Sequence, residues 1–256
     1  MKVIRGIIGF FAIVSLVFST PGCTSKSADD LAVQTVAKAD GIVKPPQAFI
    51  DLLFAEQTIK EVNKISSIKS PDPSSVWGKF KIAEKLQSQN KIELAKQVLM
   101  EIVSDTSSES RTVLWAWNGL RALGEKPKRT QVFGLVLEVP QKNETEYLAM
   151  YSDLRARYIN YTGHIDVWEA SDNEMDKFLN RITAQSQNIV DKSMPTRGRQ
   201  KMKTNKVRFS FLTSNGIYQS EETLDNLSQG NTDLGELFLT STEVLQRLVE
   251  QSESVN

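Results

Sequence analysis

The residue types best suited to catalysis gather in one short stretch, HIDVWE. His164, Asp166 and Trp168 stand at every second position, so on a β-strand they share one face, where the carboxylate could orient the imidazole. No nucleophile accompanies the pair in the local sequence. Hydrophobic alternation favours a simpler interpretation, in which His164 and Asp166 face solvent. Ile165 and Val167 would then face the core.

A second set of candidates combines arginine and tyrosine on a predicted hairpin. These two residue types are over-represented at binding hot spots, where they supply contact area and hydrogen bonds. The candidate binding residues of this set are Tyr151, Arg155, Arg157, Tyr158 and Tyr161. The alternative interpretation is structural, with the arginines pointing outward and the tyrosines half buried along the sheet.

The clearest charge feature is the stretch at residues 192–206, which holds six bases and no acid. Polybasic segments bind anionic lipid head groups, and this one could also contact a cell-wall polymer. Its candidate binding residues are Arg197, Arg199, Lys201 and Lys203. Residues 221–256 carry eight acids and one base, so a solvated connection balanced by this acidic part is the alternative that we favour.

Several kinds of site find no support in the sequence. A zinc site needs three or four His, Cys or carboxylate ligands, and the chain has one histidine and one cysteine. It contains no Gly-x-x-x-x-Gly-Lys loop, no Gly-x-Gly-x-x-Gly fingerprint and no Gly-x-Ser-x-Gly elbow. We therefore expect no metal and no cofactor. A glycosidase-type pair of carboxylates needs no local motif, so that possibility stays open.

The first 22 residues have the features of a secretory signal peptide. Lys2 and Arg5 precede an uncharged apolar run at residues 6–19. That run is shorter than the roughly 20 residues that a helix needs to cross a bilayer. The order of these features therefore predicts export rather than a retained membrane-spanning helix.

The motif TPGC, from Thr20 to Cys23, resembles the lipobox of bacterial lipoprotein precursors. The resemblance implies cleavage after Gly22 and a diacylglyceryl group on Cys23, so that two or three acyl chains hold the protein on a membrane. No acidic residue directly follows Cys23, which in this family favours the outer membrane, facing the periplasm or the exterior. Residues 23–44 would form a flexible tether. The alternative is an ordinary signal peptide, which would leave a soluble secreted or periplasmic protein.

Composition limits the remaining possibilities. Cleavage after Gly22 would remove two bases, Lys2 and Arg5, and would leave 29 bases against 31 acids. A net charge near −2 argues against a nucleic-acid partner, whose binding domains are strongly basic. Cys23 is the only cysteine, so no disulfide can form within the chain and stability must come from a hydrophobic core.

The pattern of apolar residues predicts an α+β fold. Helical spacing runs through residues 45–127, where Ala83, Ala95 and Leu99 resemble a tetratricopeptide-type helical hairpin, although a plain helical bundle is the alternative that we favour. From residue 131 the spacing of the apolar residues changes from a helical period to the alternation that is typical of strands. We expect residues 128–256 to form an antiparallel β-meander of four strands, an amphipathic helix, a fifth strand and a C-terminal helix.

These observations predict a membrane-anchored envelope lipoprotein with a non-enzymatic binding function. Its expected partners are the membrane, through the lipid on Cys23, and a protein or an envelope polymer. One alternative is a carboxylate-type hydrolase acting on an envelope polymer, with its site near the HIDVWE strand or the arginine-tyrosine hairpin. Another is a protein that neutralises a toxin in the envelope.

Overall fold

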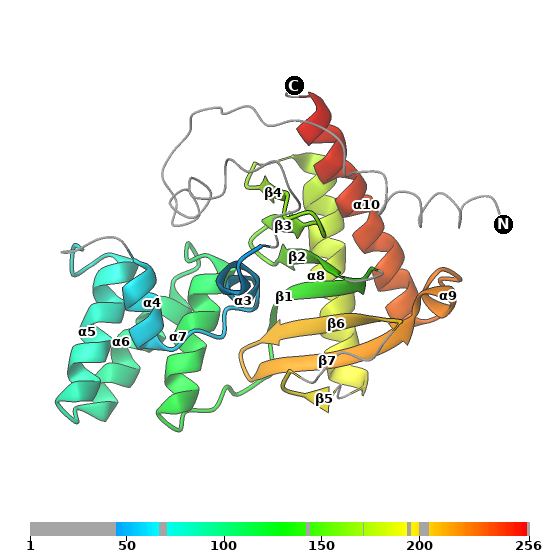
Figure 1. Cartoon of the computed structure of the whole chain (residues 1–256). Helices are drawn as coiled ribbons and strands as arrows, with labels where there is room; N and C mark the ends of the chain where they lie inside the picture. The colour runs from blue at the N-terminus through cyan, green and yellow to red at the C-terminus, as the bar shows by residue number, and fades with distance from the viewer. Residues whose placement is uncertain are drawn as a thin grey trace.

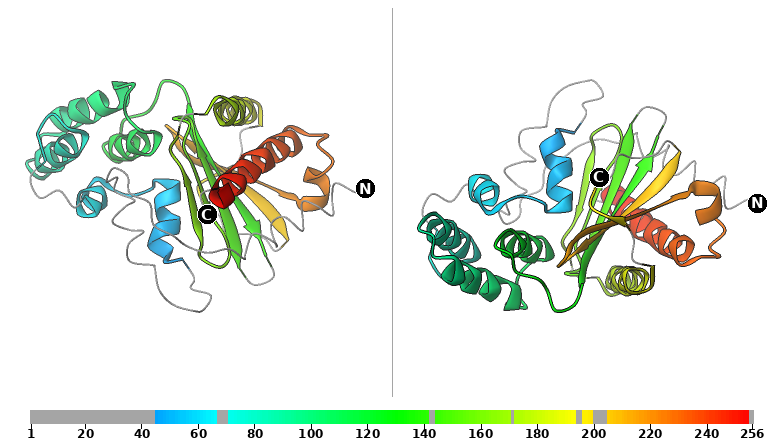
Figure 2. Two further views of the ribbon diagram at one scale, coloured as in Figure 1. Left: turned by 90° about the horizontal axis from the view of Figure 1, so that it is seen from above. Right: turned by 90° about the horizontal axis from the view of Figure 1, so that it is seen from below.

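The computed structural model describes residues 45–66, 71–141, 144–170, 172–193, 196–199 and 205–254. The predicted signal peptide, Cys23, the tether, Lys201 and Lys203 lie outside these ranges. A group of N-terminal helices, a seven-stranded sheet and a layer with two long helices form three layers, and Figure 2 shows the sheet between the two helical layers. The predicted α+β class is confirmed.

Five short helices form the N-terminal layer. They are α3 (Gln47–Phe54), α4 (Ile59–Ile65), α5 (Val76–Ser88), α6 (Ile92–Ser104) and α7 (Ser110–Ala122). Thr58 and Glu61 form a capping box at the start of α4, and the Ser75 hydroxyl caps α5. Ala83 and Ala95 are fully buried, which lets α5 and α6 pack closely as a hairpin. The tetratricopeptide-type resemblance of this hairpin stays a prediction.

Helix α7 is buried on nearly every side and joins the helical layer to the sheet. The Trp115 indole donates a hydrogen bond of 2.8 Å to Gln57 Oε1, just before α4. At Gly119 an added Cβ would lie 2.6 Å from Ile59 Cδ1 and 2.9 Å from Leu99 Cδ1. A glycine at this position therefore lets α7 approach α4 and α6 closely.

Every strand pair in the sheet is antiparallel, and the order is β4-β3-β2-β1-β6-β7-β5. The strands are β1 (Val132–Pro140), β2 (Thr145–Tyr151), β3 (Ala156–Ile159), β4 (Ile165–Trp168), β5 (Thr196–Arg197), β6 (Lys206–Thr213) and β7 (Gly216–Thr223). The first four are the predicted meander and β6 is the predicted fifth strand. Sequence reasoning missed β5 and β7.

Each face of the sheet packs against a different set of helices. On one face, Leu137 and Phe209 belong to a core shared with α8 (Asn173–Ser193) and α10 (Asp233–Ser254). The short helix α9 (Leu224–Leu227) adds to this core. On the other face, Val136 and Leu212 belong to a core shared with α3, α4 and α7. Successive residues of a strand point to opposite faces, so the central strand β1 is buried almost throughout.

Within the part of the chain that the structure describes, no helix is both long and apolar enough to span a bilayer.

Candidate functional site

The structure separates the five candidate residues of the arginine-tyrosine hairpin. Tyr158 is buried in the core under α8 and α10, whereas Tyr151 is buried in the core on the opposite face. The Tyr151 hydroxyl donates a hydrogen bond of 2.9 Å to the Leu53 carbonyl, which ties the sheet to α3. Tyr161 follows β3 and is half buried. These rings therefore form no common surface.

The two arginines of this hairpin are held by carboxylates. Arg155 is half buried and lies 2.9 Å from Asp153 and 3.4 Å from Glu109. Arg157 is buried and lies 2.6 Å from Glu169, at the end of β4. The expectation that both arginines point outward is wrong for Arg157, because β4 and the residue after it cover and neutralise its side chain.

Two candidate arginines of the predicted basic segment, Arg197 and Arg199, lie within the described residues. The guanidinium of Arg199 lies 3.9 Å from the centroid of the Phe54 ring and 3.5 Å from each of two carboxylates, those of Asp51 and Glu56. Arg197 is exposed, and its Nη2 donates a hydrogen bond of 3.4 Å to Asn215 Oδ1. Arg199 is thus a contact between the basic segment and the helical layer, while Arg197 presents its charge to solvent.

An open groove with a volume of about 640 Å³ lies between α4, α5 and α7. We call it the α4/α5/α7 groove, and most of the side chains that line it are polar or charged. The residues are Glu56, Thr58, Ile59, Lys60, Glu84, Gln87, Ser88, Asn118, Gly119, Arg121 and Ala122. Sequence reasoning did not identify this site, because its residues come from three separate helices.

Two polar side chains of α7 hold one wall of the α4/α5/α7 groove in place. Asn118 Nδ2 donates to the carbonyl of Ala55, and its Oδ1 accepts a hydrogen bond from Arg121. Arg121 Nη1 also donates a hydrogen bond of 2.7 Å to the Ser214 carbonyl, in the turn between β6 and β7. The signal in the sequence was a pair of polar residues, three positions apart, in the part of α7 that is otherwise apolar from Val113 onward.

The His164 and Asp166 side chains form the predicted pair, at 3.0 Å between His164 Nε2 and Asp166 Oδ1. Hydrogen bonding to Asp166 raises the pKa of His164, although burial opposes this shift. The expected orientation of the strand is wrong: Asp166 is buried with Trp168, and Val167 is 42% exposed. β4 is an edge strand whose contacts are with β3 and α10, so α10 determines which face is buried.

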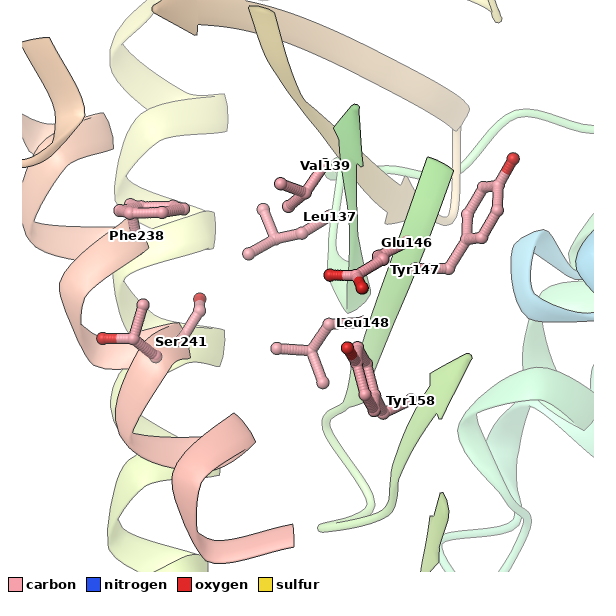
Figure 3. Close-up of a pocket in the computed structure, with 9 residues that line it drawn as sticks. Leu137, Val139, Glu146, Tyr147, Leu148, Tyr158, Phe238 and Ser241 are labelled. Carbon is pink, nitrogen blue, oxygen red and sulfur yellow. The ribbon is translucent and has the colours of Figure 1, made fainter. Parts of the chain in front are cut away.

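A carboxyl group is buried on the same face of the sheet, in a narrow hollow between the sheet and α10 (Figure 3). Glu146 is 1% exposed and its Oε1 has no hydrogen-bond partner, whereas its carboxyl accepts a hydrogen bond of 3.2 Å from Gln141. Burial raises the pKa of Glu146 to about 7, and nearby hydrogen-bonding groups, first among them Tyr158, oppose the shift. Burial, followed by the charge of Glu146, raises the pKa of Tyr158.

The hollow beside Glu146 is mainly apolar. Leu137 and Leu148 line it from the sheet and Phe238 lines it from α10, as Figure 3 shows. It leaves no room for a water molecule. The Glu146 carboxyl can therefore change its protonation state near neutral pH, but the hollow that it faces does not admit water. The signal in the sequence was a glutamate in register with the inward-facing Leu148 and Met150 of β2.

A buried charge network occupies the other face of the sheet. Arg208 on β6 lies 2.7 Å from Glu221 on β7 and 3.7 Å from Glu138 on β1. Ser210 donates to Glu138, and Gln219 donates to Ser210. Burial raises the pKa of Glu138, and the Arg208 charge opposes the shift. Because its charges pair with one another, this network has a structural role.

Among the described residues, no three His, Cys, Asp or Glu side chains lie close enough together to hold a metal ion. No protein-family model, curated protein or solved structure matches the chain.

Proposed function

We propose that the protein is a non-enzymatic binding module held at a membrane by a lipid on Cys23, and that an extended segment of a partner protein occupies the α4/α5/α7 groove. The observation that carries this proposal is the groove, because its volume of about 640 Å³ falls in the range of sites that hold small ligands. Both faces of the sheet, by contrast, are packed against helices.

The chemistry of the lining supports a polypeptide as the occupant. A polypeptide offers one N–H donor and one C=O acceptor per residue. Gln87 offers an amide that can both donate and accept, and the Ser88 hydroxyl, which donates to the Lys85 carbonyl, can still accept a hydrogen bond. A sugar polymer would pack its rings against aromatic side chains, and none is present among the described residues that line the groove.

The carboxylate-type hydrolase has less support from the geometry. Such an enzyme needs a substrate and a water molecule at its reacting carboxylates. The buried Glu146 faces a hollow without room for water, and the adjoining Asp166 is covered by the same helical layer. Neither carboxylate is placed to meet a polymer substrate.

Site-specific photo-crosslinking tests the groove. The full-length protein, with p-benzoylphenylalanine at Gln87, is produced in an export-competent bacterium and irradiated. The control carries the same group at Lys177, an exposed position on α8, on the far side of the sheet. We expect one protein adduct from position 87 and none from position 177.

A second variant links that adduct to the groove. Ser88→Trp fills the groove at an exposed position and should abolish the adduct, whereas Lys177→Trp should not. Equal cross-linking from both positions, or none from either, would contradict the proposal.

Mass spectrometry of the mature N-terminus tests the membrane anchor. We expect a diacylglyceryl group on Cys23 as the first residue, and we expect Cys23→Ser to release the protein from the membrane fraction without detergent. A free thiol at Cys23 would contradict the proposed membrane anchor, but it would not affect the proposal about the groove.

A further inference from the structure

Two arginines from distant parts of the chain converge on the turn between β6 and β7. Arg121, on α7, donates its hydrogen bond of 2.7 Å to the Ser214 carbonyl, and Arg197, on β5, donates one of 3.4 Å to the Asn215 side chain. Ser214 and Asn215 are the two residues of this turn, which points toward α7 in Figure 1. The two guanidinium groups are therefore close neighbours.

Within the described residues, neither guanidinium forms an ion pair with a carboxylate. In the described part of the chain, Arg121 and Arg197 have no carboxylate oxygen within 4.0 Å, whereas Arg199 has two. Burial and then the charge of Arg197 lower the pKa of Arg121. Glu56 acts on Arg121 in the opposite direction, but its carboxylate lies 3.5 Å from Arg199. Two like charges thus remain side by side, an arrangement that a bound anion would stabilise.

The positions of the two side chains suit a ligand in the groove. Arg121 lines the α4/α5/α7 groove and is half buried, while Arg197 is exposed and contacts the same turn as Arg121. Each guanidinium has five N–H donors, and the contacts to Ser214, Asn118 and Asn215 use only some of them. The remaining donors can form charge-assisted hydrogen bonds, which are about twice as strong as neutral ones.

We propose that Arg121 and Arg197 bind a carboxylate, so that the partner segment in the groove carries an acidic side chain at this end. This inference rests on the proposed function, because it assigns the chemical class of the groove's occupant. An acidic peptide fits better than a lipid head group, since half-buried Arg121 belongs to the wall of a groove that an extended chain can enter. A flat bilayer would meet exposed side chains first.

Fluorescence anisotropy with two labelled octapeptides tests the assignment. The mature lipid-bearing protein, in neutral detergent, is titrated into (Ser-Glu)₄ and (Ser-Gln)₄, both amidated at the C-terminus, so that the two peptides differ only in the charge of their side chains. We expect (Ser-Glu)₄ to bind about tenfold more tightly, and Arg197→Gln to reduce that ratio below twofold. Arg197 is exposed, so this variant should fold normally. The matched control, Arg129→Gln, removes an exposed arginine paired with Asp191 and should preserve the ratio.

The outcomes separate this inference from the proposed function. If both octapeptides bind equally and Ser88→Trp abolishes both interactions, the groove function stands and the carboxylate site is overturned. If Arg197→Gln leaves binding of (Ser-Glu)₄ unchanged, the site is also overturned. If the protein binds vesicles of phosphatidylglycerol through Arg197 but binds neither octapeptide, the arginines serve a membrane and the inference fails. If neither octapeptide binds and position 87 gives no cross-link, both proposals fail.

Discussion

The buried carboxyl of Glu146 should make the stability of the fold depend on pH. Burial raises the pKa of this group from its ordinary value of 4.5 to about 7. Between these two values the folded protein binds more protons than the unfolded chain, so the free energy of unfolding falls as the pH rises. A rise of the pKa from 4.5 to about 7 corresponds to about 3 kcal/mol of stability, which is lost over this pH interval and is fully lost above pH 7.

Glu146→Gln isolates this contribution, because the amide keeps the shape of the carboxyl and cannot ionise. Near pH 5 the wild-type carboxyl is largely protonated, so the two proteins should differ by less than about 1 kcal/mol. At pH 8.5 the variant should be more stable by about 3 kcal/mol. Urea denaturation at the two pH values, followed by circular dichroism, gives both differences.

A matched control distinguishes burial from the mere loss of a negative charge. Glu243→Gln removes an exposed carboxylate on α10, the helix that covers Glu146, and should change stability by less than about 0.5 kcal/mol at either pH. The wild-type profile also contains His164, whose raised pKa gives stability that is lost as the pH rises. Both proteins contain His164, so its contribution cancels in the difference between the wild type and Glu146→Gln. If the variant kept the wild-type pH dependence, the idea of a buried titrating carboxyl under α10 would be refuted.

Three further changes test other contacts of the fold. Arg208→Met leaves the buried Glu138 and the half-buried Glu221 without their cation. The variant should lose about 3–5 kcal/mol of stability at pH 7.5 in urea denaturation, and a loss below about 1 kcal/mol would contradict a buried ion network. Tyr151→Phe removes the hydrogen bond to the Leu53 carbonyl and should lower the free energy of unfolding by about 1–2 kcal/mol in the same urea assay. An unchanged urea midpoint would show that this hydrogen bond does not stabilise the fold. Asp166→Asn removes the carboxylate that raises the pKa of His164, so the NMR titration of its ring should move to lower pH; an unmoved curve would mean that the pair does not form in solution.

The strands and helices with a regular apolar pattern could be predicted from the sequence. The four strands of the meander, β6, α8 and the C-terminal helix all follow from periods of two or 3.6 residues. β7 escaped prediction for a specific reason. Its residues Gln219 and Glu221 point to a buried face, where Ser210 and Arg208 on β6 bind them. Ile217 is the one apolar residue of this inward row, so β7 shows no apolar alternation that would reveal it.

The candidate sites were less predictable than the fold. The spacing of His164 and Asp166 correctly suggested a hydrogen-bonded pair, yet the buried face of β4 depended on the position of α10, far along the chain. The α4/α5/α7 groove combines side chains from three helices, and the two arginines at its end come from α7 and β5. No local pattern brings such residues together.

The sequence by itself determined the α+β class, the order of most elements and the lipobox resemblance at Cys23, because each depends on neighbouring residues or on short periods. Tertiary structure decided which strand faces are buried, which charges are neutralised and where a groove stays open. The physical reason is that burial and charge pairing depend on the whole environment of a side chain. Arg199 meets Asp51 only after the chain has folded back across nearly 150 residues, and Arg121 meets Ser214 across 93.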